Sequence, residues 1–268
     1  ITLSKITAEN EKTNEYTRKQ ILKVGIYLGL YATILTSIVF ILLFKFIVLY
    51  LLKQSDCYYP LLISLTMIPF SMLNGVYRGF YNGLDNIKTS SNSALIEQIG
   101  RMIFSTLLLL IFSKKGLIVS VSISVFSMTI GEICSFLYNI FKVKKVLNKT
   151  CNNINPLKNL EKKIFTLSFS ETLSHLVINL SFFLEPIIYT YVLGKINISQ
   201  NEIMYHYSEV NAYALPLLTM FIFTSSCIAT VIIPTISKNN YNNNSKVLTE
   251  NALRFSLIPG ILLGIILY

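Results

Sequence analysis

The stretch PFSMLNGVYRGFYNGLDNIKTSSNSALIEQIGR, residues 69–101, decides the fold of this chain. It joins two apolar segments, each long enough to cross a bilayer, through a short polar turn. Within it, Gly75, Gly79 and Gly83 recur at every fourth position, so they lie on one side of a helix and let a neighbouring backbone approach closely. The stretch therefore predicts two membrane helices, the first of which has a packing face of glycines.

The same stretch carries three charges that lipid would not tolerate on an exposed face. Arg78 lies beside the glycines near the predicted membrane boundary, while Glu97 and Arg101 are one helical turn apart inside the second apolar segment. Ionised side chains at this depth face protein or water rather than hydrocarbon. We therefore expect a polar interior behind these helices.

Composition gives the class of protein. Hydrophobic residues make up 53% of the 268 residues and charged residues only 13%, and apolar runs recur near the roughly 20-residue length that spans a bilayer. These values predict an all-α, polytopic helical membrane protein and exclude a soluble globule. The net charge of +10 is then a property of the loops of a membrane protein, and nucleic-acid binding is not expected.

Seven membrane crossings are expected, the seventh incomplete, after a polar loop or surface helix over residues 1–23. Pro60 and Pro69 predict a kink in the second crossing. The crossings are expected at about residues 24–50, 58–81, 92–112, 117–141, 164–193 and 209–233, and from about residue 252 onward.

Lysine and arginine are distributed unevenly between alternate loops. Loops 1–23, 78–92, 142–163 and 238–254 hold 17 of these residues, and the other three loops hold four. Because the cytoplasmic loops of membrane proteins are enriched in basic residues, residue 1 and the lysine-rich segment 142–163 are predicted to be cytoplasmic.

A short repeat predicts how the crossings are grouped. The sequence TLSK at residues 2–5 and the sequence TISK at residues 235–238 each precede a polar stretch and an apolar span. If the copies are equivalent, two helices are missing before residue 2, and two lobes with twelve to fourteen helices in all are expected. The predicted parts are an N-terminal lobe lacking its first two helices (1–141), a cytoplasmic linker (142–163) and a C-terminal lobe cut off after its third helix begins (164–268).

Several motifs, in order along the whole chain, resemble those of a known family. RGFYNG at residues 78–83, with IEQIGR at residues 96–101, is similar to the signature of the stage V sporulation protein B branch of the polysaccharide flippases. Further resemblances lie at residues 2–9 (TLSKITAE), 131–138 (GEICSFLY), 179–186 (NLSFFLEP) and 233–237 (IPTIS). Two positions depart from the family pattern, because Ser170 replaces a usual proline and His175 replaces a usual arginine.

The resemblance implies the two-lobed, MATE-like fold of the multidrug/oligosaccharidyl-lipid/polysaccharide exporter superfamily. The implied activity is that of an alternating-access flippase, not an enzyme, in the cytoplasmic membrane. The implied cargo is an undecaprenyl-linked sugar or a lipid II-like peptidoglycan precursor, for cell-wall or spore cortex synthesis. Membrane lipids are implied as partners, and no cofactor is implied.

A flippase moves a polar, often phosphate-bearing headgroup through the membrane without covalent chemistry, so cations inside the membrane are candidate cargo contacts. Arg101 either binds phosphate or forms a structural ion pair with Glu97. Arg78 either contacts cargo or anchors its helix at the cytoplasmic edge, where it would snorkel and cap the turn.

Three further ionisable residues lie within predicted spans. Glu132 and Glu185 are candidates for a coupling or gating group, because a buried carboxylate must be paired, protonated or hydrated. His175 is either a neutral residue with a backbone or hydroxyl partner or a pH-sensitive residue of the cavity. The four cysteines are scattered, so neither a metal site nor a disulfide framework is predicted.

Other classes of protein stay open. A multidrug or cation antiporter of the same superfamily would also have two lobes and buried carboxylates, with a more apolar cavity. A nonfunctional fragment of a split gene is a further alternative. An embedded glycosyltransferase is disfavoured, because it needs acidic metal ligands or a catalytic base in a large outer loop, and the predicted outer loops are short.

Overall fold

The computed structural model describes residues 1–10, 15–52, 55–146, 160–196, 198–216, 227–233, 235–236 and 243–267. These residues are helical apart from short turns and links, and no strand occurs among them, as the composition predicts for a polytopic helical membrane protein. By internal contacts the chain divides into two units, Ile1–Phe165 and Thr166–Tyr268.

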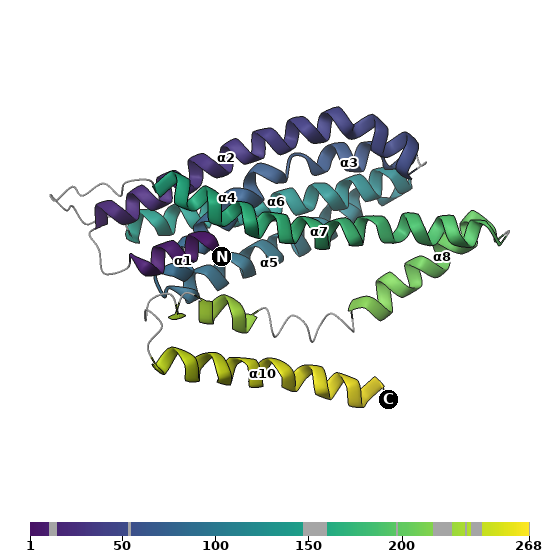
Figure 1. Cartoon of the computed structure of the whole chain (residues 1–268). Helices are drawn as coiled ribbons and strands as arrows, with labels where there is room; N and C mark the ends of the chain where they lie inside the picture. The colour runs from purple at the N-terminus through teal and green to yellow at the C-terminus, as the bar shows by residue number, and fades with distance from the viewer. Residues whose placement is uncertain are drawn as a thin grey trace. The chain divides into compact units, whose positions relative to one another are not determined.

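The first unit is a bundle of long helices joined by tight links (Figure 1). Its elements are α1 (Thr2–Glu9), α2 (Glu15–Phe46) with a π-helical extension (Ile47–Leu52), a 3₁₀ turn (Ser55–Cys57), α3 (Tyr58–Ser64), α4 (Ile68–Gly83), α5 (Ile87–Phe112), a second 3₁₀ turn (Ser113–Lys115) and α6 (Leu117–Val146). Pro69 lies in the first turn of α4, where its missing N–H costs no helical hydrogen bond. The kink predicted in the second crossing is therefore present as an interruption at residues 65–67.

The N-terminal helix α1 is packed inside the first unit, which differs from the predicted loop or surface helix. Its buried residues are Thr2, Ser4, Ile6, Thr7 and Ala8. The helix contacts α4 and, to a smaller extent, α2. It is held there because the glycines of α4 leave room for its backbone.

Two of the three glycines in the predicted packing face make this close approach. A Cβ on Gly83 would lie 2.5 Å from both the carbonyl oxygen of Ser4 and the Cβ of Thr7, and one on Gly79 would lie 3.5 Å from the Cβ of Leu3. Glycine at position 83 is thus required by the space available. An added Cβ on Gly75 would meet no described atom within 4 Å, so the contact with α1 does not extend to that position.

A second close contact joins α5 to α6. A Cβ on Gly100 would lie 3.4 Å from the Cα of Gly131, and a Cβ on Gly131 would lie 2.7 Å from the carbonyl oxygen of Glu97 and 3.2 Å from the Cβ of Arg101. The two backbones therefore meet without an intervening side chain, as small residues allow in membrane helices. This contact fixes Glu97 and Arg101 against α6.

The second unit contains most of α7 (Leu160–Gly194), then α8 (Gln200–Glu209), a π-helical turn (Val210–Ala214) and α10 (Asn243–Leu267). The first turn of α7 belongs to the first unit, where Leu160 and Ile164 are buried and Lys163 Nζ lies 2.7 Å from Glu9 Oε2. Helix α8 begins with a capping box, in which Ser199 and Glu202 exchange hydrogen bonds with each other's backbone.

Five segments among the described residues are long and apolar enough to cross a membrane: Thr17–Tyr50, Tyr58–Gly83, Ile87–Phe112, Leu117–Lys144 and Leu160–Gly194. They correspond to the first five predicted crossings, although the first, third and fifth begin four to seven residues before their predicted starts. The chain is therefore a multi-pass membrane protein.

Several sequence predictions fall on residues outside the described ranges. The sixth predicted crossing includes residues 217–226, the second copy of the repeat includes 237–238, and most of the predicted linker lies at 147–159. The seventh predicted crossing overlaps α10. The division into two lobes and a linker stays a prediction.

Candidate functional site

Glu97 lies between two arginines in the interior of the first unit. Its Oε2 accepts a hydrogen bond from Arg78 Nη2 at 2.5 Å, and its Oε1 accepts one from Arg101 Nη2 at 2.8 Å. The side chain of Glu97 is 8% exposed, whereas those of Arg78 and Arg101 are 25% and 29% exposed. The carboxylate is therefore buried, and each guanidinium keeps an accessible edge.

Two serines extend this site. Arg78 Nε donates to Ser93 Oγ at 3.1 Å and Arg78 Nη2 donates to Ser135 Oγ at 2.9 Å, while the two hydroxyl oxygens lie 2.8 Å apart. Both serines are fully buried. The arginine cluster, defined as Arg78, Ser93, Glu97, Arg101 and Ser135, thus draws its side chains from α4, α5 and α6.

The side chain of Arg78 points between helices, which differs from the interpretation that it snorkels to the membrane edge. Backbone hydrogen bonds close the turn over residues 80–86 instead. Glu97 is ten residues past the start of α5, or about 15 Å along the helix axis, so the cluster lies well inside the span. The pair that the four-residue spacing predicts between Glu97 and Arg101 is present, and Arg78 joins it from another helix.

The arginine cluster has an excess of positive charge, because two guanidinium groups share one carboxylate. In addition, Arg101 Nε is buried and has no hydrogen-bond acceptor within the described part of the chain. Guanidinium groups bind carboxylate and phosphate oxygens through paired N–H donors. The cluster therefore has the charge and the donors to hold an anion inside the membrane.

A second set of buried polar residues, the amide cluster, consists of Asn74, Tyr81, Glu132 and Asn139. Asn74 Nδ2 donates to the carboxylate Oε2 of Glu132 at 2.7 Å and to its backbone oxygen at 2.8 Å. Asn139 Nδ2 donates to Asn74 Oδ1 at 2.9 Å, and the Tyr81 hydroxyl donates to the Asn139 carbonyl at 2.8 Å. Glu132 is 5% exposed, so its carboxylate is held among neutral groups.

The two clusters are neighbouring layers of one polar interior. Asn74 precedes Arg78 by one turn of α4, and Glu132 precedes Ser135 by about one turn of α6. Adjacent turns are separated by about 5 Å along a helix. A change of charge in one layer is therefore felt in the other, because both lie in a medium of low dielectric constant.

Sequence reasoning missed the neutral partners Asn74, Ser93, Ser135 and Asn139 as site residues. A periodic signal was available, because Ser93 precedes Glu97 by four positions and Asn139 follows Glu132 by seven. Serine in a membrane helix commonly bonds back to its own backbone, however. The spacing therefore identifies a polar face without identifying its partner helix.

His175 and Glu185 lie on α7 in the second unit and belong to neither cluster. Both side chains are exposed, and neither forms a hydrogen bond or ion pair with the described residues. Glu185 lines a shallow groove of about 720 Å³ along α7, beside Ser181 and Tyr189. These two side chains are thus exposed, whereas those of the clusters are bonded to protein.

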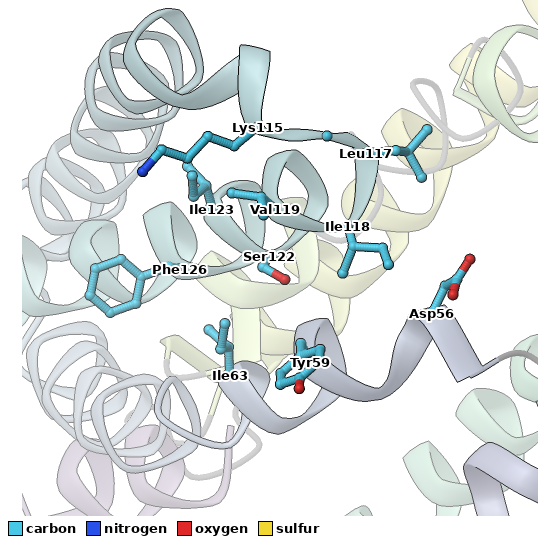
Figure 2. A pocket seen from close by; sticks show the side chains of 11 residues that line it. Asp56, Tyr59, Ile63, Lys115, Leu117, Ile118, Val119, Ser122, Ile123 and Phe126 are labelled. Atoms are coloured by element: carbon cyan, nitrogen blue, oxygen red, sulfur yellow. The ribbon is translucent and has the colours of Figure 1, made fainter.

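A separate cavity of about 800 Å³ opens in the first unit where α3 and α6 begin. Figure 2 shows Asp56 and Lys115 at its opposite sides, and Tyr59 and Phe126 are among the mainly apolar side chains that line it. Lys115 Nζ lies over the Phe112 ring at 5.0 Å from the ring centroid. The cavity lies between the link before α3 and the link before α6, both of which the charge pattern predicts to face outwards. Its lining suits apolar rather than anionic ligands.

Comparison with known proteins identifies the family. The model of the polysaccharide biosynthesis protein family matches residues 2–240, which include both clusters and all of α7. The chain belongs to this family. Family membership agrees with the resemblance that the sequence motifs carry.

One curated relative is "Stage V sporulation protein B" of Bacillus subtilis (strain 168). It is 26% identical over 277 aligned residues, which cover 100% of this chain and 54% of the relative. The chain therefore spans about half the length of this relative. No solved structure matches the chain.

Proposed function

We propose that this member of the polysaccharide biosynthesis protein family moves a lipid-linked saccharide across the cytoplasmic membrane as an alternating-access flippase. Family membership and the apolar helices support this proposal. The observation that carries it is the arginine cluster, in which two partly exposed guanidinium groups share one buried carboxylate inside the membrane.

A lipid-linked saccharide presents its phosphate or pyrophosphate at the point where the polar headgroup meets the lipid tail. An anion at that point needs a cationic path through the membrane interior, while the tail remains in the bilayer. Arg78 and Arg101 can supply this path, because each keeps an accessible edge while Glu97 holds it in position. No covalent bond is made or broken, so the proposed activity is transport and not enzymatic catalysis.

The finer parts of the proposal come from the relative and from the loop charges. The cargo is proposed to be an undecaprenyl-linked sugar or a peptidoglycan precursor resembling lipid II, used in cell-wall or spore cortex synthesis. Residue 1 and the segment 142–163 are proposed to be cytoplasmic. Two lobes are proposed to rock about that segment, which exposes the central cavity to each side in turn.

The test is translocation of a fluorescent lipid-linked precursor in vesicles. It compares the chain with a version extended by its flanking sequence to the length of the relative. Translocation by the extended protein alone supports the flippase and shows that residues 1–268 do not suffice for transport. In the extended protein, Arg101→Gln should lower the rate about 10- to 100-fold, because a charge-assisted contact is lost.

A matched control is Glu250→Gln, which neutralises an exposed carboxylate on α10 and should leave the rate unchanged. Folded Arg101→Gln protein that translocates at the wild-type rate contradicts the proposed role of the arginine cluster. The same assay tests Glu185 as a gating group, since Glu185→Gln should lower transport without loss of folded protein.

A multidrug or cation antiporter is the alternative function. The apolar cavity beside Tyr59 and Phe126 and the accessible carboxylate of Glu185 favour it. Efflux of a hydrophobic cation from vesicles, with no translocation of the lipid-linked precursor by either folded protein, would support the antiporter over the flippase.

A further inference from the structure

The apolar cavity between α3 and α6 contains one buried hydroxyl group without a partner and has opposite charges at two of its sides. We propose that this cavity binds one molecule of phosphatidylethanolamine from the membrane. One acyl chain lies in the cavity, its ester carbonyl accepts a hydrogen bond from Ser122, and the phosphate and ammonium groups lie beside Lys115 and Asp56. The inference goes beyond the transport function proposed above and does not rest on it.

The buried hydroxyl group belongs to Ser122. This residue lines the cavity and is 8% exposed, and its Oγ has no hydrogen-bond partner in the part of the chain that the structure describes. Figure 2 shows its oxygen directed into the space between Ile118 of α6 and Tyr59 of α3. An unpaired hydroxyl in an apolar site is destabilising, so a ligand that brings an acceptor is favoured there.

Other serines of α6 satisfy their hydroxyl groups within the helix. Ser120 Oγ donates to the carbonyl oxygen of Gly116 at 3.0 Å, Ser124 Oγ to that of Ser120 at 3.0 Å, and Ser127 Oγ to that of Ser124 at 2.6 Å. This bonding back to the backbone is usual for serine in a membrane helix. Ser122 does not share it, so its O–H is available to an acceptor on the cavity side.

The size of the cavity fits one acyl chain of one leaflet. Its volume of about 800 Å³ is typical of pockets that enclose small molecules. Its lining includes Leu117, where the α6 span begins, and Phe126, which is about 14 Å further along the helix axis. The hydrocarbon of one leaflet is about 15 Å thick. Ser122 lies about 8 Å from Leu117 along the axis, between the level of the head group and that of the chain end, where an ester carbonyl is found.

The mouth of the cavity offers one cation and one anion. Lys115 and Asp56 line its opposite sides (Figure 2), and both are exposed. No ion pair joins Asp56 to Lys115 or to another described residue, so both charges can bind a ligand. A phosphate group matches the ammonium of Lys115, and a primary ammonium group, with three N–H donors, matches the carboxylate of Asp56.

The start of α6 favours a phosphate at the same place. The N–H of Ser120 donates to the carbonyl of Gly116, whereas the preceding N–H groups of Leu117, Ile118 and Val119 have no acceptor inside the helix. All three of these residues line the cavity. No acidic residue lies in the first turn of α6, so the positive end of the helix dipole is open to an anion.

These features together favour a zwitterionic phospholipid over other amphiphiles. Phosphatidylglycerol supplies the phosphate and the ester but no cation for Asp56. A lipid-linked saccharide has a polyprenyl chain, which offers no ester carbonyl to Ser122. A hydrophobic cation supplies a charge for Asp56 but neither an acceptor for Ser122 nor an anion for Lys115.

The experiment counts the lipids bound to the extended protein in detergent by native mass spectrometry, during titration with phosphatidylethanolamine or phosphatidylglycerol of the same acyl chains. One phosphatidylethanolamine should bind several-fold more tightly than further lipid molecules and than phosphatidylglycerol. Ser122→Ala should weaken this first site about 3- to 10-fold, because a hydrogen bond is lost. Ser120→Ala is the matched control, since that hydroxyl is bonded within the helix, and it should bind as the wild type does.

The charged residues test the choice of head group. Asp56→Asn should weaken the binding of phosphatidylethanolamine about 2- to 5-fold and leave that of phosphatidylglycerol unchanged, so the preference between the two lipids decreases. Lys115→Gln should weaken both lipids, because both carry the phosphate. Lys114→Gln changes a neighbouring exposed lysine that does not line the cavity. This matched control should leave both affinities unchanged.

Thermal unfolding separates a ligand contact from a structural role of Ser122. Without lipid, Ser122→Ala should be at least as stable as the wild type, because the change removes an unpaired buried hydroxyl. Phosphatidylethanolamine should raise the unfolding midpoint of the wild type and of Ser120→Ala more than that of Ser122→Ala, since a bound ligand stabilises the folded state. A Ser122→Ala protein that gains as much from the lipid as the wild type does overturns the inference.

Three other results would also overturn it. Equal binding of both lipids by the wild type and all the variants would mean that the lipids only surround the membrane spans. Displacement of phosphatidylethanolamine by a lower concentration of undecaprenyl phosphate would assign the cavity to the chain of the cargo. Displacement by a lower concentration of tetraphenylphosphonium would assign it to the antiporter alternative. The arginine cluster is tested separately, by translocation.

Discussion

Glu97 of α5 and Glu132 of α6 have surroundings opposite to those of Glu185 on α7. Glu97 and Glu132 are buried and bonded to side chains from other helices, whereas Glu185 is exposed on α7. In the most apolar 18-residue stretch of each span, 28% of the residues of α6 are buried and none of those of α7 are. A polar residue in a membrane helix therefore becomes structural only where a second helix supplies its partner, and otherwise it stays accessible.

The largest expected difference between the two regions is in the cost of removing a carboxylate. Glu97→Ala leaves two arginines without their counter-ion and should lower the free energy of unfolding by about 3 kcal/mol or more. Glu185→Ala removes no bond to the described residues and should change it by less than about 0.5 kcal/mol. Thermal unfolding in detergent measures both changes. Similar decreases in stability for the two variants would contradict the difference between the two regions.

A second difference concerns space around the glycines. Gly131→Ala places a methyl group 2.7 Å from the backbone oxygen of Glu97, so the helices must separate at a cost of about 1–3 kcal/mol. Gly75→Ala meets nothing within 4 Å among the described residues and should be neutral or stabilise its helix by up to about 1 kcal/mol. Denaturant titration of the two variants decides whether the contact between α5 and α6 is as close as described.

Threonine hydroxyls give a smaller test of the same comparison. Thr129 bonds to Thr66 on the other side of a helix contact at 3.0 Å, so Thr129→Val should cost about 0.6–1.7 kcal/mol. Thr190 on α7 donates to Pro186 of its own helix, and Thr190→Val should cost less than about 0.5 kcal/mol. Equal unfolding midpoints for the two valine variants would contradict the distinction.

The smallest effect is expected where α7 enters the first unit. The ion pair between Lys163 and Glu9 is partly exposed, with side-chain exposures of 53% and 27%. Glu9→Gln should therefore cost no more than about 1 kcal/mol, and the difference should disappear in high salt. A larger cost that persists in salt would mean that this contact anchors α7 more firmly than its exposure indicates.

Features of the fold that depend on single segments could be predicted from sequence. Apolar length gave the helical membrane class and the first five crossings, Pro60 and Pro69 gave a kink in the second crossing, and the spacing of Glu97 and Arg101 gave their ion pair. Each of these depends on residues that are neighbours along one helix, where periodicity determines geometry.

Features that depend on the rotation and depth of one helix against another could not be predicted. Arg78 reaches Glu97 across 19 positions, and Asn74 reaches Glu132 across 58. The glycine face gave the right side of α4 but not the extent of its contact, because the position of α1 decides which glycines are covered. The buried position of α1 itself was missed, since its polar sequence is typical of a surface.

The contact between Gly100 and Gly131 holds charged side chains at a fixed place inside the membrane, where the membrane potential acts on them. Because the two backbones touch there, Glu97 and Arg101 are held against α6. Displacing one charge through the whole membrane potential changes its energy by about 2.3 kcal/mol per 100 mV. Arg78 and Arg101 share the single carboxylate of Glu97, so the three residues carry one net positive charge, and a potential that is negative inside pulls the arginine cluster inwards. In the proposed cycle, a bound anion with one negative charge cancels this charge, and voltage then no longer favours either position.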